Sequence, residues 1–578
     1  MHRIGFLLIV GVVFSISTSI ILATQTDKNF QTENGFIATI SIDGHERTFY
    51  VSSSGNASTP QPLMIVLGQS GMSGQGTANL TQFHALEATQ GFVIAYPQAI
   101  DFWNDGRTIA GFLPSGEPVD DVEYIDRIID YLAGVYTIDL TRVYVVGYRD
   151  GGRMAYHLAC QRSQRFAGAA VVGALMWEYI DRSCTSSAAT PLSMLVIMSS
   201  QSQDYALGGG QYQSIFDSSR AYAYLSLNDT VNRWLARNQC NMETNQQFDA
   251  ARINTNCLNG ARVGSYIYAG GENTWLGTSR ANYTGLDLGV MITQFLLGDP
   301  IWHNQSPAQT TEVLRTDVLY IPNSYDGSRA MPLVVMLHPT QLNGAEFAYI
   351  SNMNSLAEQE NFIVVYPEAI GRRWYYDRGY EFGAHSENYD DTLFITTLVD
   401  TLKTQINISK VYLVGMSSGG FMTQRIACET SNQFAAFSVV GSTAFPGLDA
   451  ICADAPSVPL LMIHGTADAD VPWQGLLAPE MSPYPYTTLP MQDTLSLWAT
   501  HNDCNLNFEM ERLPSASPET HIEHYQFDDC ARDLQLYAVV GGGHAWIGIP
   551  NRLPTSFSGI VNTDLVAGDV IWDFLQTY

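Results

Sequence analysis

The chain has 578 residues, of which 46% are hydrophobic and 15% are charged. This length exceeds that of one ordinary domain, and the composition excludes disordered and fibrous classes of protein. The formal net charge of −28 repels phosphate backbones and anionic lipid surfaces, so nucleic acid is excluded as an expected partner.

Residues 1–24 have the pattern of an export signal. Arg3 precedes an apolar run from Ile4 to Ala23, and a polar stretch follows. The run is as long as a membrane span and lacks a clean cleavage site, but its serine and threonine residues dilute its apolar character. We expect a cleaved signal peptide and a secreted, extracellular protein. An N-terminal membrane anchor with the protein facing outside is the alternative, and no other stretch is apolar enough to span a bilayer.

Two long segments of the chain repeat one pattern. Residues 120–173 and 390–441 each contain an acidic pair, an amphipathic helix, a strand ending in Val-Gly, a glycine-rich turn and a helix ending in Ala-Cys. Shorter matches pair Pro62–Gly68 with Pro332–His338 and Gly91–Ile100 with Asn361–Ile370. Alternating strands and helices of this kind predict a mostly parallel sheet covered by helices on both faces.

The repeat predicts two tandem α/β domains, at residues 33–298 and 310–578. The polar, turn-rich residues 299–309 are the expected linker. In the second copy, an apolar residue recurs every four positions, which predicts a helix packed on the sheet. These residues are Phe394, Leu398, Leu402 and Ile406. The short apolar run Val411–Val414 predicts a strand buried on both faces.

Each half of the chain contains four cysteines, and the first two of each half are separated by 24 positions. An even number with repeated spacing in an exported chain favours disulfides, whereas eight buried thiols in a cytosolic protein are the alternative. The predicted pairs are Cys160–Cys184, Cys240–Cys257, Cys428–Cys452 and Cys504–Cys530. Because no C-x-x-C or clustered Cys/His spacing occurs, we expect no metal site, and no cofactor is indicated.

The segment Gly415–Gly419 fits G-x-S-x-G, with Ser417 as the candidate nucleophile. It follows a predicted strand and opens a predicted helix, which is the context in which this motif has meaning. The sharp turn crowds its neighbours, so glycines flank the serine. The turn would lift the Ser417 hydroxyl out at the carboxyl end of the sheet.

A serine hydroxyl needs a base, and the base needs an orienting acid. His544 directly follows the predicted strand Leu534–Val540, and Asp468 follows the predicted strand Leu460–Ile463. The chain order Ser, Asp, His is that expected of α/β-hydrolases. Asp470 competes with Asp468 for the role of the acid, and we favour Asp468.

The oxyanion hole should use the backbone N–H of Ser418, the residue after the nucleophile. Its second donor should come from the loop after strand Leu333–Leu337, where Pro339 has no N–H and Thr340 is the better candidate. Aromatic residues gather near these loops and are candidates to bind an apolar or aromatic acyl group, with core packing as the alternative for each. The three tryptophans among them are Trp374, Trp473 and Trp546.

The second half resembles the polyhydroxybutyrate depolymerase and feruloyl esterase family of secreted α/β-hydrolases. The matching motifs are PLVVMLH, VVYPEAI, the acidic pair, VYLVGMSSGGFMTQRIAC, HGTADADVPW and GGGHAW, which together run across nearly the whole half. The resemblance implies the same triad and the hydrolysis of a polyester or of a hydroxycinnamate ester on plant polysaccharide. One departure is that the family usually has His-Gly-Cys where this chain has His338-Pro339-Thr340, in the loop that should supply the second oxyanion donor.

The first half aligns with the same family but lacks its chemistry. Arg149 stands at the nucleophile position, Ser202 at the acid position and Asn273 at the histidine position. Arginine cannot be deprotonated to attack a carbonyl, and asparagine cannot act as a general base. We therefore expect two tandem α/β-hydrolase domains, of which the first is a pseudoenzyme.

The leading function is that of a secreted serine esterase acting through an acyl-enzyme. An exported acyltransferase would use the same site with an alcohol in place of water. A non-catalytic surface binding protein is the alternative from another class, and a complete, correctly ordered triad argues against it.

Overall fold

The computed structural model describes residues 30–32, 35–42, 44–53, 58–107, 119–184, 190–202, 204–213, 221–244, 246–247, 250–268, 275–276, 287–298, 315, 317–376, 390–476, 487–549 and 558–578. The predicted export signal (1–24), the predicted linker (299–309) and Asn273 lie outside these ranges.

The first half of the chain builds an 11-stranded sheet in the order β1-β2-β3-β5-β4-β6-β7-β8-β13-β12-β11. Its strands are β1 (Phe30–Thr32), β2 (Gly35–Ile42), β3 (His45–Ser52), β4 (Gln61–Leu67), β5 (Val93–Pro97), β6 (Ile138–Tyr148), β7 (Gly168–Val172), β8 (Ser193–Ser199), β11 (Gln246–Gln247), β12 (Ala251–Asn254) and β13 (Val263–Tyr268). Two further strands, β9 (Gly210–Gln213) and β10 (Ala221–Tyr224), form a separate pair. The helices are α1 (Gly74–Thr81), α2 (Phe83–Gln90), α3 (Asp121–Val135), α4 (Asp150–Gln161), α5 (Glu178–Ser183), α6 (Leu227–Arg237) and α7 (Leu288–Leu297).

The second half builds a 9-stranded sheet in the order β14-β16-β15-β17-β18-β19-β22-β21-β20. Its strands are β14 (Asp317–Tyr320), β15 (Met331–Leu337), β16 (Ile363–Pro367), β17 (Ile408–Met416), β18 (Ala436–Val440), β19 (Leu460–Gly465), β20 (Asn505–Arg512), β21 (His521–Asp528) and β22 (Leu534–Val540). Its helices are α8 (Gly344–Ser351), α9 (Met353–Glu360), α10 (Asp391–Gln405), α11 (Ser418–Glu429), α12 (Leu448–Cys452), α13 (Met491–His501) and α15 (Ala567–Leu575).

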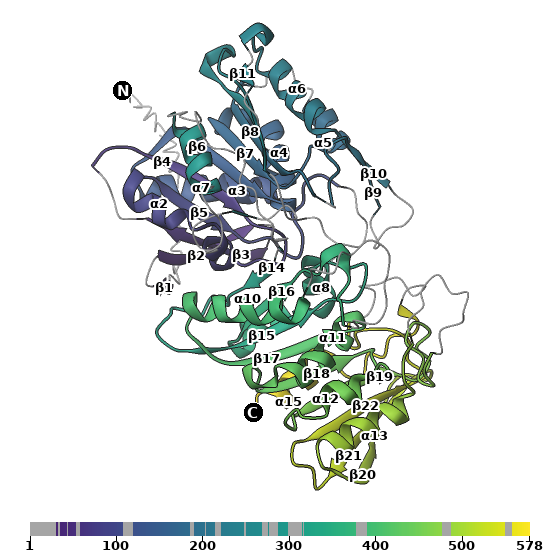
Figure 1. Cartoon of the computed structure of the whole chain (residues 1–578). Helices are drawn as coiled ribbons and strands as arrows, with labels where there is room; N and C mark the ends of the chain where they lie inside the picture. The colour runs from purple at the N-terminus through teal and green to yellow at the C-terminus, as the bar shows by residue number, and fades with distance from the viewer. Residues whose placement is uncertain are drawn as a thin grey trace, which may run out of the picture.

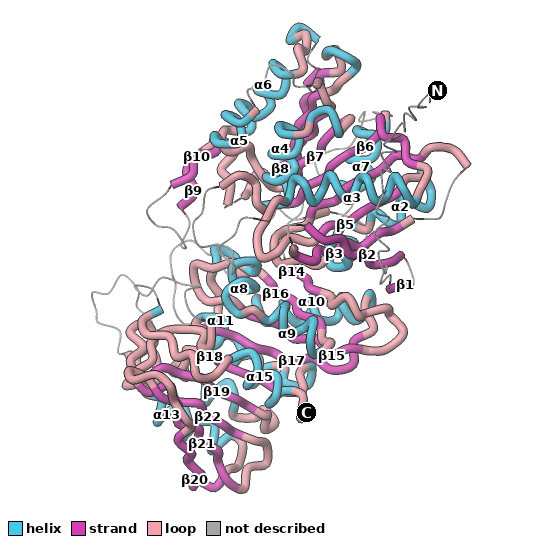
Figure 2. The backbone as a smooth tube through the Cα atoms, turned by 180° about the vertical axis from the view of Figure 1, so that it is seen from behind, coloured by secondary structure: helices cyan, strands magenta, loops and turns pink. Residues whose placement is uncertain are grey.

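The two sheets share one strand order. Every strand of the second sheet has a counterpart in the first, from β3 matching β14 to β11 matching β20, and the first sheet adds β2 and β1 beyond β3. The central strands are parallel and, apart from the amino-terminal residues of β6 and β17, buried, and helices cover both faces (Figures 1 and 2). This is the α/β-hydrolase class of fold, in which the carboxyl ends of the central strands carry the chemistry.

The two halves pack directly on each other through α1 and the edge strand β14. Ser73, the N-cap of α1, donates its N–H to the Leu319 carbonyl at 3.4 Å and accepts the Ile321 N–H on its Oγ at 2.9 Å. A Cβ at Gly76 would lie 2.0 Å from the Leu319 oxygen, so only glycine permits this approach. One apolar cluster runs through the contact, with Met72 on one side and Val318 and Ala348 on the other.

The α10 helix differs from the expected stripe. Its buried apolar side chains are Ile395, Val399 and Leu402, whereas the predicted Phe394 and Leu398 are only partly buried beside them. A spacing of four residues drifts by about 40° per step on a helix of 3.6 residues per turn, so the predicted stripe leaves the buried face toward its N-terminal end. The predicted strands lie where expected, and β17 extends beyond Val411–Val414 at both ends.

The acidic pair that opens α3 and α10 has two separate structural roles. Asp120 and Asp390 are the N-caps and accept a backbone N–H from the first turn of each helix. The second member of each pair is buried against an arginine: Asp121 bonds Arg47 at 2.7 Å, and Asp391 bonds Arg315. The repeated motif is thus explained by folding rather than by chemistry.

All four predicted cysteine pairs are bonded in the structure: Cys160–Cys184, Cys240–Cys257, Cys428–Cys452 and Cys504–Cys530. Each half therefore carries two covalent cross-links. Across the described ranges, no helix has both the length and the apolar content that crossing a bilayer requires.

Candidate active site

Ser417 occupies a strained turn between β17 and α11. Its φ of 54° and ψ of −119° lie outside the regions that non-glycine residues favour, and its N–H is held by the Val440 carbonyl at 2.9 Å. A Cβ at Gly415 would lie 2.1 Å from the Gly419 oxygen, and one at Gly419 would lie 2.1 Å from the Leu337 oxygen. Both motif glycines are therefore required by the close approach of backbone to backbone.

His544 is brought to Asp468 by the glycine loop that follows β22. The Ala467 N–H donates to the Gly542 carbonyl at 2.9 Å, and the Gly541 N–H donates to Thr466 Oγ1 at 2.9 Å. These bonds fasten the loop to the residues just before Asp468. As a result, His544 Nδ1 lies 2.7 Å from Asp468 Oδ2.

The structure pairs His544 with Asp468 and not with Asp470. The other carboxylate oxygen of Asp468 accepts the N–H groups of Asp470 at 2.9 Å and Val471 at 2.8 Å, and the Asp470 side chain is exposed. Burial alone would lower the pKa of His544, but the hydrogen bond and charge of Asp468 outweigh it and raise that pKa above 6.5. Burial alone would raise the pKa of Asp468, but the hydrogen bond and charge of His544 outweigh burial, so the pKa of Asp468 is lowered.

The imidazole lies beside the strand end that holds Ser417. A Cβ at Gly441 would lie 3.2 Å from His544 Cε1, and Gly441 directly follows Val440, the acceptor of the Ser417 N–H. Within the described residues no hydrogen bond joins Ser417 Oγ to His544. The contact of Nδ1 with Asp468 leaves Nε2 as the nitrogen that can exchange a proton with a nucleophile.

The two predicted oxyanion donors lie on segments that touch each other. Ser418 begins α11, and its neighbour Gly419 packs against the carbonyls of Leu337 and His338, two residues before Thr340. Neither the Ser418 N–H nor the Thr340 N–H donates to another described residue. Both are available to an incoming oxygen.

The first half has a carboxylate at the position that corresponds to the predicted oxyanion hole. By the strand alignment, Ser70 corresponds to Thr340 and Asp150 to Ser418. There the Ser70 N–H donates at 2.9 Å to the carboxylate of Asp150, and the Ser70 hydroxyl bonds the same side chain. A carboxylate oxygen thus accepts a hydrogen bond from the backbone N–H that corresponds to that of Thr340. This supports the assignment of Thr340 to the oxyanion hole.

Arg149 adopts the nucleophile's backbone conformation in the first half. Its φ of 52° and ψ of −115° match those of Ser417, and its N–H donates to Val172 at 2.8 Å as Ser417 donates to Val440. Ser202, at the acid position, accepts the Tyr205 N–H on its hydroxyl at 3.0 Å.

Of the three tryptophans predicted near the substrate, two are core residues. Trp374 is 1% exposed and donates its indole N–H to the His338 carbonyl at 2.9 Å. Trp546 is 3% exposed and packs edge-on against Phe347. Only Trp473 is partly exposed, beside His464. Packing is thus the physical reason for Trp374 and Trp546, and substrate contact remains a prediction for Trp473.

Two buried histidines that sequence reasoning did not single out support the site. His338 accepts the Ala369 N–H on Nε2 at 3.0 Å and lies 2.8 Å from the Pro339 carbonyl through Nδ1. His464 lies 2.9 Å from the Val471 carbonyl. Burial lowers the pKa of each to about 4, so both are neutral ring donors that hold the loops before Thr340 and around Asp468. Their positions at the carboxyl ends of two predicted strands are the sequence signal that could have identified these histidines as part of the site.

The chain is similar to known esterases. Residues 316–469 match the family model described as esterase PHB depolymerase, a match that includes Ser417 and Asp468 and ends before His544. This half of the chain is similar to that esterase family over the matched residues. The chain is 26% identical over 262 residues to the putative esterase NocK of Nocardia uniformis subsp. tsuyamanensis, covering 42% of this chain and 74% of that protein. It is 24% identical over 242 residues to feruloyl esterase B of Piromyces equi, covering 40% of this chain and 42% of the relative.

Among solved structures, the acetyl xylan esterase from Aspergillus awamori matches with 20% identity over 40% of this chain and 88% of that chain, with a TM-score of 0.30. The chain spans less than half the length of its Piromyces relative. The similarity to these esterases indicates a carboxylic ester hydrolase.

Proposed function

We propose that the protein is an exported serine esterase in which Ser417, Asp468 and His544 form the catalytic triad. The observation that carries the proposal is the 2.7 Å contact of His544 with Asp468 beside the strained turn of Ser417. A strained nucleophile turn, a buried acid–base pair and two unused N–H groups are the parts that acyl transfer through a serine requires.

In the proposed mechanism, His544 Nε2 takes the proton of Ser417 Oγ as the oxygen attacks the ester carbonyl. The Ser418 and Thr340 N–H groups stabilise the negative oxygen of the tetrahedral intermediate. The bond to the alcohol then breaks, and the alcohol leaves with the proton from His544. Water then attacks the acyl-enzyme and loses a proton to His544. The bond from the acyl group to Ser417 Oγ breaks, His544 returns the proton to Ser417 Oγ, and the acid is released.

The first half is, in this proposal, a degenerate α/β-hydrolase domain joined in tandem to a catalytic one. Its support is the shared strand order, the matched torsion angles of Arg149 and Ser417, and the repeated disulfide spacing. Arg149 supplies no nucleophile, and Asp150 fills the anion position with its own carboxylate. The half keeps its folding residues without its chemistry.

The proposed substrates are hydroxycinnamate or related esters on plant polysaccharide, with a hydroxyalkanoate polyester as the second class. The support is kinship to feruloyl esterases and to the depolymerase family, because the triad itself accepts any acyl group that fits. Export is supported by the bonded cysteines, which persist in oxidising compartments.

The test compares purified wild-type protein and Ser417→Ala on nitrophenyl esters of several acyl lengths, methyl ferulate and polyhydroxybutyrate film. Hydrolysis by wild type that disappears in the variant would support the triad, and the preferred acyl group would assign the substrate class. Product analysis in the presence of an alcohol separates hydrolysis from acyl transfer. A wild-type protein inactive on every ester would reject the proposal.

A further inference from the structure

Arg149, the residue in place of a nucleophile, reaches across to the second half of the chain. Its side chain is 5% exposed, and its guanidinium bonds both carboxylate oxygens of Glu368, at 2.9 Å and 3.4 Å. Glu368 is itself 7% exposed and directly follows β16. A fork of this kind fixes direction as well as distance, because both bonds share one plane.

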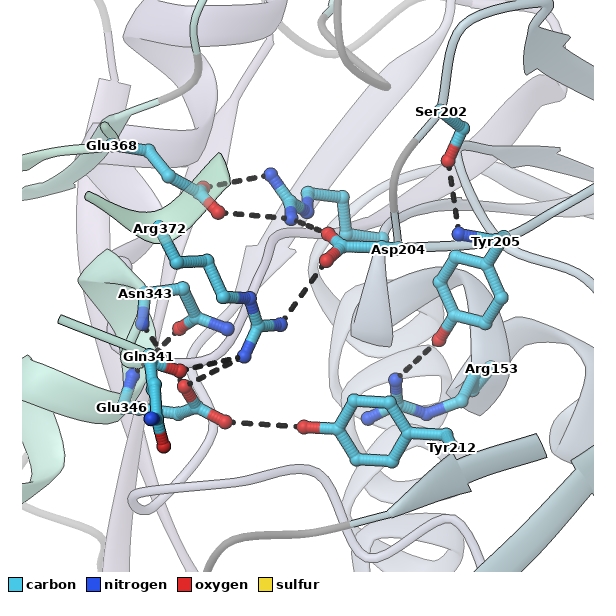
Figure 3. A network of polar contacts seen from close by, with 11 residues as sticks. Arg153, Ser202, Asp204, Tyr205, Tyr212, Gln341, Asn343, Glu346, Glu368 and Arg372 are labelled. Carbon is cyan, nitrogen blue, oxygen red and sulfur yellow. Dashed lines mark hydrogen bonds and ion pairs between the residues drawn. The ribbon is translucent and has the colours of Figure 1, made fainter. Parts of the chain in front are cut away.

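Asp204 links Arg149 to Arg372, which lies four residues after Glu368 in the second half. It bonds Arg149, and it accepts from Arg372 Nη2 at 3.1 Å. Figure 3 shows Asp204 of the first half with Glu368 and Arg372 of the second half pointing toward one another. Burial alone would raise the pKa of Asp204, but the two guanidiniums lower it to about 2. The first half thus binds both ends of residues 368–372.

The same short segment holds the loop that carries Thr340. At one end, the Ala369 N–H donates to His338 Nε2 at 3.0 Å. At the other end, Gln341 donates its N–H to the Arg372 carbonyl and accepts from the Arg372 guanidinium, both at 3.1 Å. Thr340 lies between these two attachments, so the position of its N–H depends on where residues 368–372 are held.

We propose that Arg149 is a positioning residue for the esterase site: the relic nucleophile turn of the first half acts as a clamp that fixes residues 368–372 and, through them, the oxyanion loop 338–341. The proposal rests on the assignment of Thr340 to the oxyanion hole. It gives the degenerate half a direct effect on turnover by the other half, without contact with the substrate.

The clamp consists of largely buried charges, which decides how it should be tested. Arg149 and Arg372 form ion pairs with Asp204, Glu368 and Glu346, and the last also accepts from Tyr212 of the first half at 3.1 Å. Removing one member outright leaves a buried charge without its partner, which destabilises the fold. Variants that keep charge or shape are therefore preferred.

The primary variants are Arg149→Lys, which keeps the charge but loses the planar fork, and Glu368→Gln, which keeps the shape but loses the charge. Each should lower kcat by roughly tenfold with KM changed by less than about twofold, because a displaced oxyanion donor weakens the transition state more than the bound substrate. The double variant should be no slower than the worse single variant, since both break the same contact. Arg142→Met is the matched control, because Arg142 forms an exposed pair with Asp139 in the same half, and it should retain wild-type kcat.

Amide hydrogen exchange provides a readout that needs no catalysis. In both primary variants, exchange at 338–342 should accelerate by roughly tenfold while exchange in α10 stays unchanged. Wild-type kcat together with unchanged exchange in the loop would overturn the clamp, as would equal losses in the Arg142 control. If the wild-type chain hydrolyses no ester but loop exchange still rises in the variants, the clamp stands and the proposed activity fails.

Discussion

Arg149 and Ser417 share one backbone conformation, with φ of 52° and 54° and ψ of −115° and −119°, at equivalent turns of the two sheets. A turn this strained persists only where the surrounding structure enforces it. In the second half the strained turn carries the hydroxyl of Ser417, the proposed nucleophile. In the first half a turn of the same conformation carries Arg149, whose guanidinium bonds Glu368 of the second half.

Ser417→Ala should abolish ester hydrolysis, with a loss of roughly 10⁴-fold or more in kcat, because no other group can form the acyl-enzyme. The fold should be unchanged, as judged by thermal unfolding. A serine-directed phosphonate should label Ser417 alone in the wild-type chain. Adding Arg149→Ser to the Ser417→Ala variant should restore nothing, because a serine there would still lack a base. Labelling of any other serine would show the nucleophile to be misassigned.

The pH dependence of kcat/KM should follow the ionisation of His544. The base must be neutral, so activity should rise as pH increases through its pKa, with a midpoint above the ordinary value of 6.5 because Asp468 raises that pKa. In Asp468→Asn this cause is removed while burial remains, so the midpoint should move to lower pH and turnover should fall by about 10⁴-fold. Asp470→Asn alters an exposed residue close to Asp468 and should change the midpoint pH and the turnover far less. A midpoint unmoved by Asp468→Asn would contradict the pairing.

Gly419→Ala should damage activity more than any ordinary helix substitution. The added Cβ would lie 2.1 Å from the Leu337 oxygen and 2.9 Å from the His338 oxygen, so the turn or the oxyanion loop must shift. Kinetics should show roughly a hundredfold loss in kcat. Gly134→Ala in α3 is the matched control, because its Cβ would meet no atom within 4 Å, and it should be neutral or slightly stabilising.

Trp374→Phe should separate positioning from substrate binding. The indole N–H holds the His338 carbonyl in the second half, and Trp103 holds the Gly68 carbonyl at 2.8 Å in the first. Trp374→Phe and the matched control Trp103→Phe each remove one of these bonds. Each should lower the free energy of unfolding by about 1 kcal/mol. Only Trp374→Phe should also lower kcat, with KM little changed. A rise in KM alone would instead return Trp374 to the substrate pocket.

Much of the site could be predicted because its determinants are local. The turn of Ser417, the loop of His544 and the segment of Asp468 each follow a strand directly, and parallel strands bring their carboxyl ends together. The disulfide pairs followed from spacing that repeats between the halves. These predictions needed no knowledge of how distant segments pack.

The remainder depends on packing between distant parts of the chain. Whether Trp374 faces a substrate or the core is decided by which loop covers it, and its short local sequence reads the same in both cases. Arg149 was interpreted only as a lost nucleophile because its partner Glu368 lies 219 positions away. No periodicity or motif relates two residues at that separation.

The contact between α1 and β14 gives the first half a structural role toward the second sheet. Among the described residues, β14 ends the second sheet, whereas its counterpart β3 is followed by β2 and β1. The outward N–H of Ile321 and carbonyl of Leu319 are satisfied by Ser73 instead of a further strand. An uncovered edge of this kind templates pairing with other chains and leads to aggregation. Without the first half this edge would be exposed, so the first half shields the second sheet from pairing with other chains.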